Sequence, residues 1–106
     1  MDKKGFVYLI CDATNDSYKV GTTKNNIEKR INQLKTGNSN EIFLKDCYES
    51  EYYKVIEKLF HRKYKPFNIN LEWFDLPNDV IFNFKEICKE IEENHLFLKE
   101  NNHFYK

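Results

Sequence analysis

The alternation of apolar and polar residues predicts a β-hairpin at the start of the chain. The apolar run 6–11 (FVYLIC) is rich in strand-forming residues and ends in the polar stretch 12–16 (DATND). The segment 17–22 (SYKVGT) has strand character again, so the two runs are expected to pair as antiparallel strands through a short turn. A further run, 42–48 (IFLKDCY), predicts a third strand.

Helical spacing of apolar residues follows the hairpin. Residues 26–36 place Ile27, Ile31 and Leu34 on one face, and Gly37 lies where a C-terminal cap is expected. The chain therefore returns from the hairpin through one amphipathic helix.

Two more helices are predicted after the third strand. Residues 51–64 form the first of them, with Ser50 as a cap and Pro66 as the residue that ends it. The other covers about 78–94 and carries one apolar stripe, made of Ile81, Phe84, Cys88 and Ile91.

The segments between and after these helices have weaker patterns. Residues 67–71 are predicted to be a loop, residues 72–75 (EWFD) a short aromatic strand or turn, and residues 95–106 a polar tail or a fraying last turn. The order of elements predicts an α+β fold, with a small antiparallel three-stranded sheet flanked by helices and a C-terminal helix. A chain of 106 residues is expected to form one domain, over 1–106.

Composition narrows the class of protein. The chain is 41% hydrophobic and 16% aromatic, which argues against disorder, and its net charge of zero argues against a histone-like binder held by bulk charge. Residues 1–65 carry 13 basic and 9 acidic side chains, so a phosphate-bearing partner would prefer this part. No apolar run approaches the ~20 residues of a membrane span, and no targeting signal is evident, so we expect a cytoplasmic protein without a membrane partner.

Cysteine and arginine are sparse. Cys11, Cys47 and Cys88 are far apart and form no CxxC pair, so reduced and partly buried thiols are expected. Only Arg30 and Arg62 are arginine among 17 cationic residues, which makes each of them worth explaining.

The hairpin carries the first candidate functional residues. Tyr8 and Lys19 either lie exposed on the surface or meet in a cleft. In a cleft, the ammonium group of Lys19 would favour the phenolate form of Tyr8. Gly21 lies inside a strand, where glycine often marks the close approach of another backbone or a ligand. Arg30, at the edge of the first helix, either binds a phosphate at the rim of the sheet or is simply exposed.

The second helix carries a carboxylate and an imidazole on one face. Glu57 and His61 are separated by four residues, so their side chains share a face. A carboxylate is a hard oxygen ligand suited to Mg²⁺ or Mn²⁺, and a histidine exchanges protons near neutral pH. By itself the pair is as compatible with an ordinary surface contact as with a site, and the chain has no HExxH, P-loop or GxSxG motif.

Taken together, these residues resemble the GIY-YIG nuclease superfamily over roughly residues 5–76. Val7-Tyr8 corresponds to the first motif, and the segment 19–23 (KVGTT) corresponds to the second. Arg30 matches the helix arginine, Glu57 matches the metal-binding glutamate, and Pro66 and Asn68 are similar to the proline and asparagine that follow it. Lysine in place of the second motif's tyrosine is typical of one branch, which this chain also resembles in Glu57 to His61 and in Glu72 to Phe74.

The resemblance implies metal-assisted hydrolysis of a nucleic-acid phosphodiester, with DNA favoured over RNA and a possible homodimer or protein partner. The implied metal ligand is Glu57, with Mg²⁺ or Mn²⁺ as the cofactor. The implied catalytic residues are Tyr8, Lys19, Arg30 and His61, and the implied substrate-binding residues are Gly21, Thr22 and Asn68. Leu34 stands where many members carry tyrosine or histidine, so either His61 fills that role or the role is absent.

Two other functions remain open at this stage. The first is a binding module on the same fold that has lost catalysis. The second is a virus-encoded protein–protein adaptor, which an exposed aromatic patch around Trp73 and Phe74 would support. The alternative for these two aromatic residues is that they close the core under the third helix.

Overall fold

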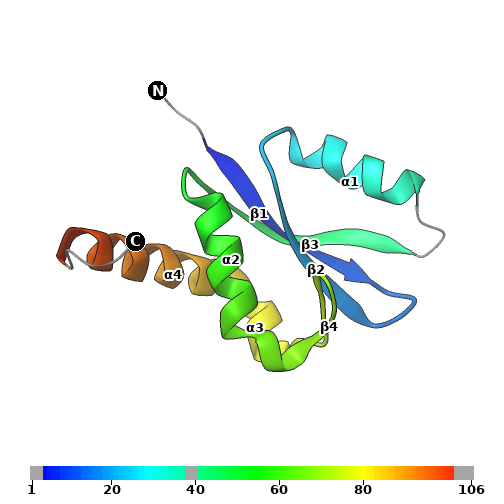
Figure 1. The fold of residues 1–106 in the computed structure, drawn as a ribbon. Coiled ribbons are helices and arrows are strands. Elements are labelled where there is room, and N and C mark those ends of the chain that lie inside the picture. The colour runs from blue at the N-terminus through cyan, green and yellow to red at the C-terminus, as the bar shows by residue number, and fades with distance from the viewer. Residues whose placement is uncertain (1–3, 38–40, 102–106) are drawn as a thin grey trace.

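The computed structural model describes residues 4–37 and 41–101, which form one antiparallel sheet with helices on both sides (Figure 1). The strands lie in the order β3-β1-β2-β5-β4. Their bounds are β1 (Gly5–Asp12), β2 (Ser17–Thr23), β3 (Ile42–Ser50), β4 (Asn68–Asn70) and β5 (Trp73–Phe74). The expected α+β class and antiparallel sheet are confirmed.

The sheet is larger than the three strands expected. Residues 68–70 were expected to be loop, but they pair with β5 as β4. These strands are too short to show an alternating pattern, because they hold three and two residues. The pairing is set by the turn between them, where Asn68 Nδ2 donates to the carbonyl oxygens of Leu71 at 2.8 Å and Trp73 at 3.0 Å.

The helices divide unequally between the two faces of the sheet. Their bounds are α1 (Ile27–Thr36), α2 (Tyr53–Lys63), the 3₁₀ turn η1 (Lys65–Phe67), α3 (Asn78–Phe82) and α4 (Phe84–Asn101). Helix α1 lies on one face, whereas α2, α3 and α4 lie on the other (Figure 1). None of these helices, within the part of the chain that is described, is long and apolar enough to cross a membrane.

The opening hairpin forms where the sequence predicted it. Strand β1 lies between β2 and β3, and Phe6–Asp12 pair with both neighbours. Val7 and Leu9 are buried in the cluster on the α2 face, and Tyr8 and Ile10 are buried in the cluster on the α1 face. The near-continuous apolar run of this strand therefore reflects burial on both faces.

The predicted ends of the first two helices are largely confirmed. Asn26 Oδ1 accepts from the Lys29 N–H at 3.1 Å, which caps α1, and Gly37 is the C-terminal cap with φ −94°. Since this φ is open to any residue, the cap does not require glycine. Ser50 Oγ accepts from the Tyr52 N–H at 2.9 Å just before α2, and Pro66 lies in η1 directly after it.

The predicted third helix is two helices. Asn83 interrupts it, because its side-chain amide and its backbone N–H both donate to the Asp79 carbonyl, at 2.9 and 3.1 Å. The second part, α4, also extends well past the predicted end near 94, to Asn101. Its last turns pack on Tyr52, whose ring lies 5.5 Å from the His95 ring and 5.5 Å from Lys99 Nζ. The remainder of the expected tail, 102–106, lies outside the described residues.

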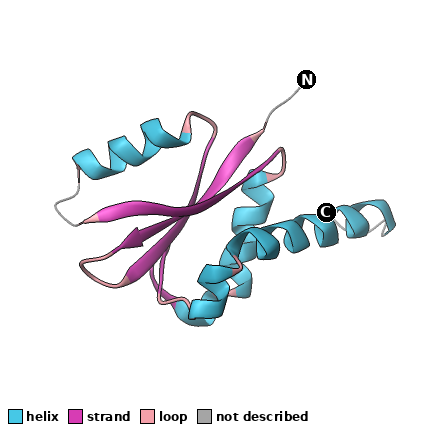
Figure 2. Ribbon diagram, turned by 180° about the vertical axis from the view of Figure 1, so that it is seen from behind, coloured by secondary structure: helices cyan, strands magenta, loops and turns pink. Residues whose placement is uncertain are grey.

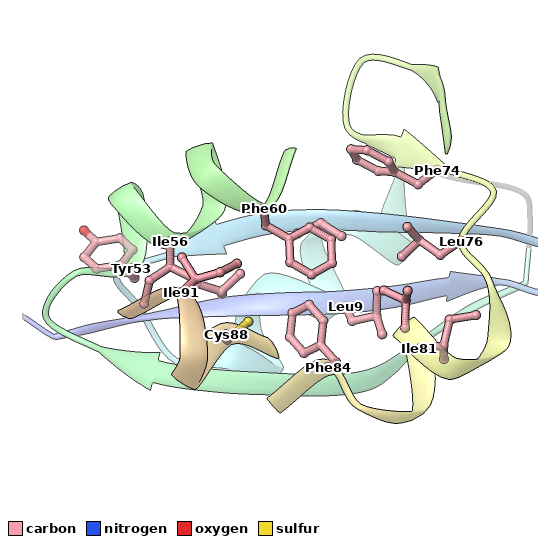
Figure 3. Packing of buried hydrophobic residues seen from close by; sticks show 13 residues of the cluster. Leu9, Tyr53, Ile56, Phe60, Phe74, Leu76, Ile81, Phe84, Cys88 and Ile91 are labelled. Carbon is pink, nitrogen blue, oxygen red and sulfur yellow. The ribbon is translucent and has the colours of Figure 1, made fainter. Parts of the chain in front are cut away.

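The main core lies between β1, α2 and α4. The predicted stripe of the third helix is buried here, together with the apolar face of α2. Figure 3 shows the ring of Phe60 next to that of Phe84, with Leu9 beside them, and the two ring centroids are 5.4 Å apart. Phe74 is buried in this core as expected, whereas Trp73 is only half-buried. Seen from behind, α4 continues past the sheet on this side (Figure 2).

A second, smaller cluster lies under α1. It consists of Tyr8, Ile10, Ile31 and Ile42, with Leu34 packed against it. Leu34 therefore contributes packing at the position where many GIY-YIG nucleases carry a tyrosine or histidine. Cys11, Cys47 and Cys88 are all free thiols, as expected.

Candidate functional site

The outer edge of β2 is only partly covered. β5 pairs with Tyr18 and Lys19, and the Val20 N–H donates to the Glu72 carbonyl at 3.1 Å. Beyond Val20, none of the strands formed by the described residues continues along this edge. The open segment, Gly21–Thr23, separates two pockets that share Thr22 as a lining residue.

The larger pocket, here called the Glu57 pocket, lies between α2 and the β4–β5 hairpin. Its volume is about 780 Å³. Four expected site residues line it (Lys19, Thr22, Glu57 and His61), and the other lining residues are Lys54, Lys58, Leu71, Glu72 and Trp73. The pocket is thus rich in charge, with four cationic or potentially cationic groups around two carboxylates.

The surroundings of Glu57 have opposing effects on the pKa of its carboxyl group. Burial raises the pKa of this carboxyl above its usual value, and Glu72 raises it further, whereas His61 and Lys19 lower it. The net shift is upward, so the folded chain holds a carboxylate where the ionised form is disfavoured. A cation bound beside Glu57 would relieve this penalty.

His61 is oriented by the backbone of β2. Its Nε2 lies 2.8 Å from the Val20 carbonyl oxygen, which can only accept, so the hydrogen lies on Nε2. The ring also packs edge-on against Phe74, with centroids 5.0 Å apart. In the neutral ring, Nδ1 is then the nitrogen that can accept a proton. The nearest oxygen of Glu57 lies 3.9 Å from Nε2.

Lys19 also faces the Glu57 pocket. Its Nζ lies 3.1 Å from Glu72 Oε1 and 5.7 Å from the centre of the Trp73 ring. The side chain is only 18% exposed. Lys19 therefore acts electrostatically on the two carboxyl groups of this pocket and is ion-paired with Glu72.

Tyr8 lies beneath the open edge, on the α1 face of the sheet. The residue is 1% exposed, and its phenol passes across Gly21, its partner in the β1–β2 ladder. A Cβ atom at position 21 would lie 2.6 Å from Tyr8 Oη. Gly21 therefore does mark a close approach, as the sequence indicated, and the approaching group is a side chain of the same sheet.

Arg30 lies in the second pocket, of about 210 Å³, on the α1 side of the open edge. Its neighbours there are polar: Thr22, Thr23, Asn25, Lys29 and Gln33. The Nε of Arg30 is buried, and it has no hydrogen-bond partner among the residues that the structure describes. An anion entering this pocket would supply the missing acceptor.

The structure thus brings Lys19, Glu57 and His61 together but leaves Arg30 and Tyr8 apart from them. Helices α1 and α2 lie on opposite faces of the sheet, so Arg30 and Glu57 can address one phosphate only around the open edge of β2. Thr22 occupies that edge and lines both pockets. Its role as a substrate-binding residue stays a prediction.

Other residues of the site were missed or have a different place from that expected. Asn68 uses its amide N–H groups on the hairpin backbone, which makes it a structural tie at the pocket rim. Lys54, Lys58 and Leu71 were not singled out from the sequence, although the i, i+4 spacing of the two lysines could have been noticed beside Glu57.

Comparisons with known proteins agree with a nuclease-related fold. The family model described as T5orf172 domain matches residues 5–92 of this chain. Neither a search of curated proteins nor a search of solved structures finds a match. The matched segment covers every element from β1 to the first half of α4. The chain therefore belongs to the T5orf172 domain family, a nuclease-related family of domains.

Proposed function

We propose that this protein hydrolyses phosphodiester bonds of nucleic acid in the manner of GIY-YIG nucleases, with a divalent metal on Glu57. Family membership supports a nucleic-acid partner. The observation that carries the proposal is the Glu57 pocket, where a half-buried carboxylate with a raised pKa lies among cationic side chains. Such a pocket suits a metal ion together with a phosphate.

The residues of this pocket fit Mg²⁺ or Mn²⁺. Among residues 4–37 and 41–101, no group of three or more His, Cys, Asp or Glu could cage a metal ion. Magnesium does not need such a cage, because it keeps several waters and binds through one or two carboxylates plus substrate phosphates. Glu57 would supply the carboxylate, and the bound ion would supply charge stabilisation at the phosphoryl oxygens.

Proton transfer in this proposal falls to His61. Its donation to the Val20 carbonyl leaves Nδ1 as the acceptor, and the ring lines the pocket. Tyr8, the residue that the family resemblance implies for this role, is buried on the other side of the β2 edge. A general base contributes typically ~10²–10⁴-fold, so the two assignments differ measurably.

Arg30 and Lys19 would act on the phosphate charge. The unpaired Nε of Arg30 offers a donor to a non-bridging oxygen at the open edge. Lys19 is held by Glu72 and Trp73, so its ammonium is fixed in position before a substrate arrives. Lys19 therefore offers a charge that needs little rearrangement.

The test is cleavage of plasmid DNA and of RNA by the purified protein, with and without Mg²⁺ or Mn²⁺. Glu57→Ala is expected to reduce cleavage to background while a thermal melt shows a folded protein. Glu86→Ala, which removes an exposed carboxylate on α4, is the matched control and should retain activity. His61→Gln should lose ~10²–10⁴-fold and Tyr8→Phe much less.

A Glu57→Ala protein that cleaves at the wild-type rate would end this proposal. Wild-type protein that binds nucleic acid but cleaves none, with any of these metals, would instead support a binding module on the same fold. Loss of activity in Tyr8→Phe without loss in His61→Gln would return the proton-accepting role to the buried phenol.

A further inference from the structure

The Glu57 pocket continues along α2 into a second hollow. This neighbouring pocket is lined by His61, Arg62, Lys65, Asn68, Leu71 and Phe74. The two pockets share His61 and Leu71. Together they make one groove between α2 and the β4–β5 hairpin, here called the α2 groove.

One wall of the α2 groove is cationic. Lys54, Lys58 and Arg62 are exposed and follow one another at four-residue spacing, so they rise along α2 in steps of ~6 Å. Lys65 continues the series in η1. This row suits the regularly spaced phosphates of an extended strand.

The opposite wall is apolar. Leu71 is 80% exposed and lines both pockets, and the half-buried Trp73 follows two residues later. The carboxylate between them, Glu72, is paired with Lys19. Leu71 and Trp73 thus present apolar surface to the groove, beside the one carboxylate that Lys19 holds in an ion pair.

Leu71 has an unfavourable backbone for its type. Its φ is +52°, in the left-handed region that glycine and asparagine favour and leucine avoids. Since the side chain is also exposed, packing in the core does not explain a leucine here. Strain of this kind persists at functional sites, where the side chain contacts something other than the fold.

We infer that the α2 groove binds an unpaired nucleic-acid strand, with phosphates on α2 and bases against Leu71 and Trp73. In a duplex the bases face inward, so the apolar wall would have nothing to contact. In a single strand the bases turn outward and stack on apolar or aromatic side chains while cations follow the backbone. This inference rests on the proposed function in naming nucleic acid as the substrate, and it restricts that substrate to single-stranded segments.

The charge on α4 agrees with this placement. Helix α4 carries exposed Glu86, Glu90 and Glu93 around a separate hollow. Such a surface repels phosphates, so a strand is directed to α2.

The first test measures binding without cleavage. Fluorescence anisotropy of labelled single-stranded DNA, single-stranded RNA and a duplex of the same sequence is recorded in EDTA, which withholds metal. We expect either single strand to bind at least about 10-fold more tightly than the duplex, and the tighter of the two single strands identifies the natural chemistry. Equal or tighter binding of the duplex, or binding of none of the three, overturns the inference.

The second test uses variants of the two walls. Leu71→Asn should lower single-strand affinity about 5-fold, leave duplex affinity unchanged and raise the melting temperature, because asparagine suits the left-handed backbone. Phe82→Ser is the matched control, since Phe82 is 86% exposed on α3 and does not line the groove. Unchanged single-strand affinity in Leu71→Asn would contradict the apolar wall.

The cationic wall is tested through salt dependence. Each of Lys54→Ala and Arg62→Ala should reduce the slope of log K against log salt by ~0.7, the value for one phosphate contact on a single strand. Lys89→Ala, on the acidic side of α4, should leave the slope unchanged. If the protein binds single strands as expected but cleaves nothing in Mg²⁺, the strand-binding groove stands and the hydrolytic function is rejected. If it cleaves nucleic acid but prefers duplex, the hydrolytic function stands and the single-strand groove is rejected.

Discussion

The two faces of the sheet differ in how much they bury. On the α2 face, thirteen of the described residues form one cluster, whereas four form the cluster on the α1 face. Helix α2 buries three residues there (Tyr53, Ile56 and Phe60), but α1 buries Ile31 alone. Most of the hydrophobic stabilisation therefore lies on one face, since it scales with the apolar area removed from water.

The candidate site draws on both faces and so combines rigid and lightly held elements. Glu57 and His61 belong to the helix with the large core, which fixes their positions. Arg30 belongs to α1, whose attachment depends on few buried contacts. Elements with few buried contacts open most readily in native proteins. The arginine is thus the site residue whose position can adjust most to a bound phosphate.

Truncation of one core residue on each face should expose this asymmetry most strongly. Phe60→Ala is expected to lower the free energy of unfolding by ~3–5 kcal/mol, and Ile31→Ala by ~2 kcal/mol, measured by urea unfolding. Phe60 is fully buried between α2 and α4, so its removal leaves a cavity that neighbours cannot fill. Equal losses in both variants would mean that the α1 face contributes as much as the larger core.

The contact between Tyr8 and Gly21 tests how tightly the α1 face is packed. Gly21→Ala would place a Cβ 2.6 Å from Tyr8 Oη, so we expect a loss of ~1–3 kcal/mol in urea unfolding. Combining it with Tyr8→Leu, which shortens the side chain, should recover part of this loss as a coupling energy of ~0.5–3 kcal/mol. If the free-energy losses of the two substitutions simply add, the α1 face accommodates the extra methyl group without a clash against Tyr8.

The smallest expected effect concerns Glu57 on the well-packed face. Because burial raises its pKa, the folded state binds this proton more tightly than the unfolded state does. Its contribution to stability is therefore largest below the unfolded-state pKa of ~4.3 and is lost as pH rises through the folded-state pKa. Glu57→Gln lacks this loss, so its melting temperature should exceed that of the wild type at pH 7 by a few degrees. The difference should shrink toward pH 4, as followed by circular dichroism, and a variant that melts lower at pH 7 would contradict the direction of the pKa shift.

The sequence predicted the elements in which apolar residues recur with the period of a strand or a helix. The strands 6–11 and 17–22, and the helices begun near Asn26 and ended near Pro66, are present because burial of one or two faces leaves a repeating pattern. It missed β4 because three residues cannot show alternation. It joined α3 to α4 because the apolar stripe runs through Asn83 without a break, while the interruption comes from a side-chain hydrogen bond.

The site was predictable in its residues more than in its arrangement. Motif order and spacing named Lys19, Glu57 and His61, which do share a pocket. Spacing alone could not tell that Arg30 and Glu57 lie on opposite faces, because this follows from how α1 and α2 pack on the sheet. Nor could it show the role of Leu71, whose position depends on a backbone conformation that the residue type itself disfavours.

The partner of His61 is a main-chain carbonyl, and this has an evolutionary consequence. Every residue type presents the same carbonyl at position 20, so substitutions along β2 that preserve the strand cannot withdraw the acceptor from Nε2. The backbone path of β2 therefore fixes the tautomer of His61. Homologous chains can therefore diverge widely in this segment and still keep the same ring nitrogen available for chemistry.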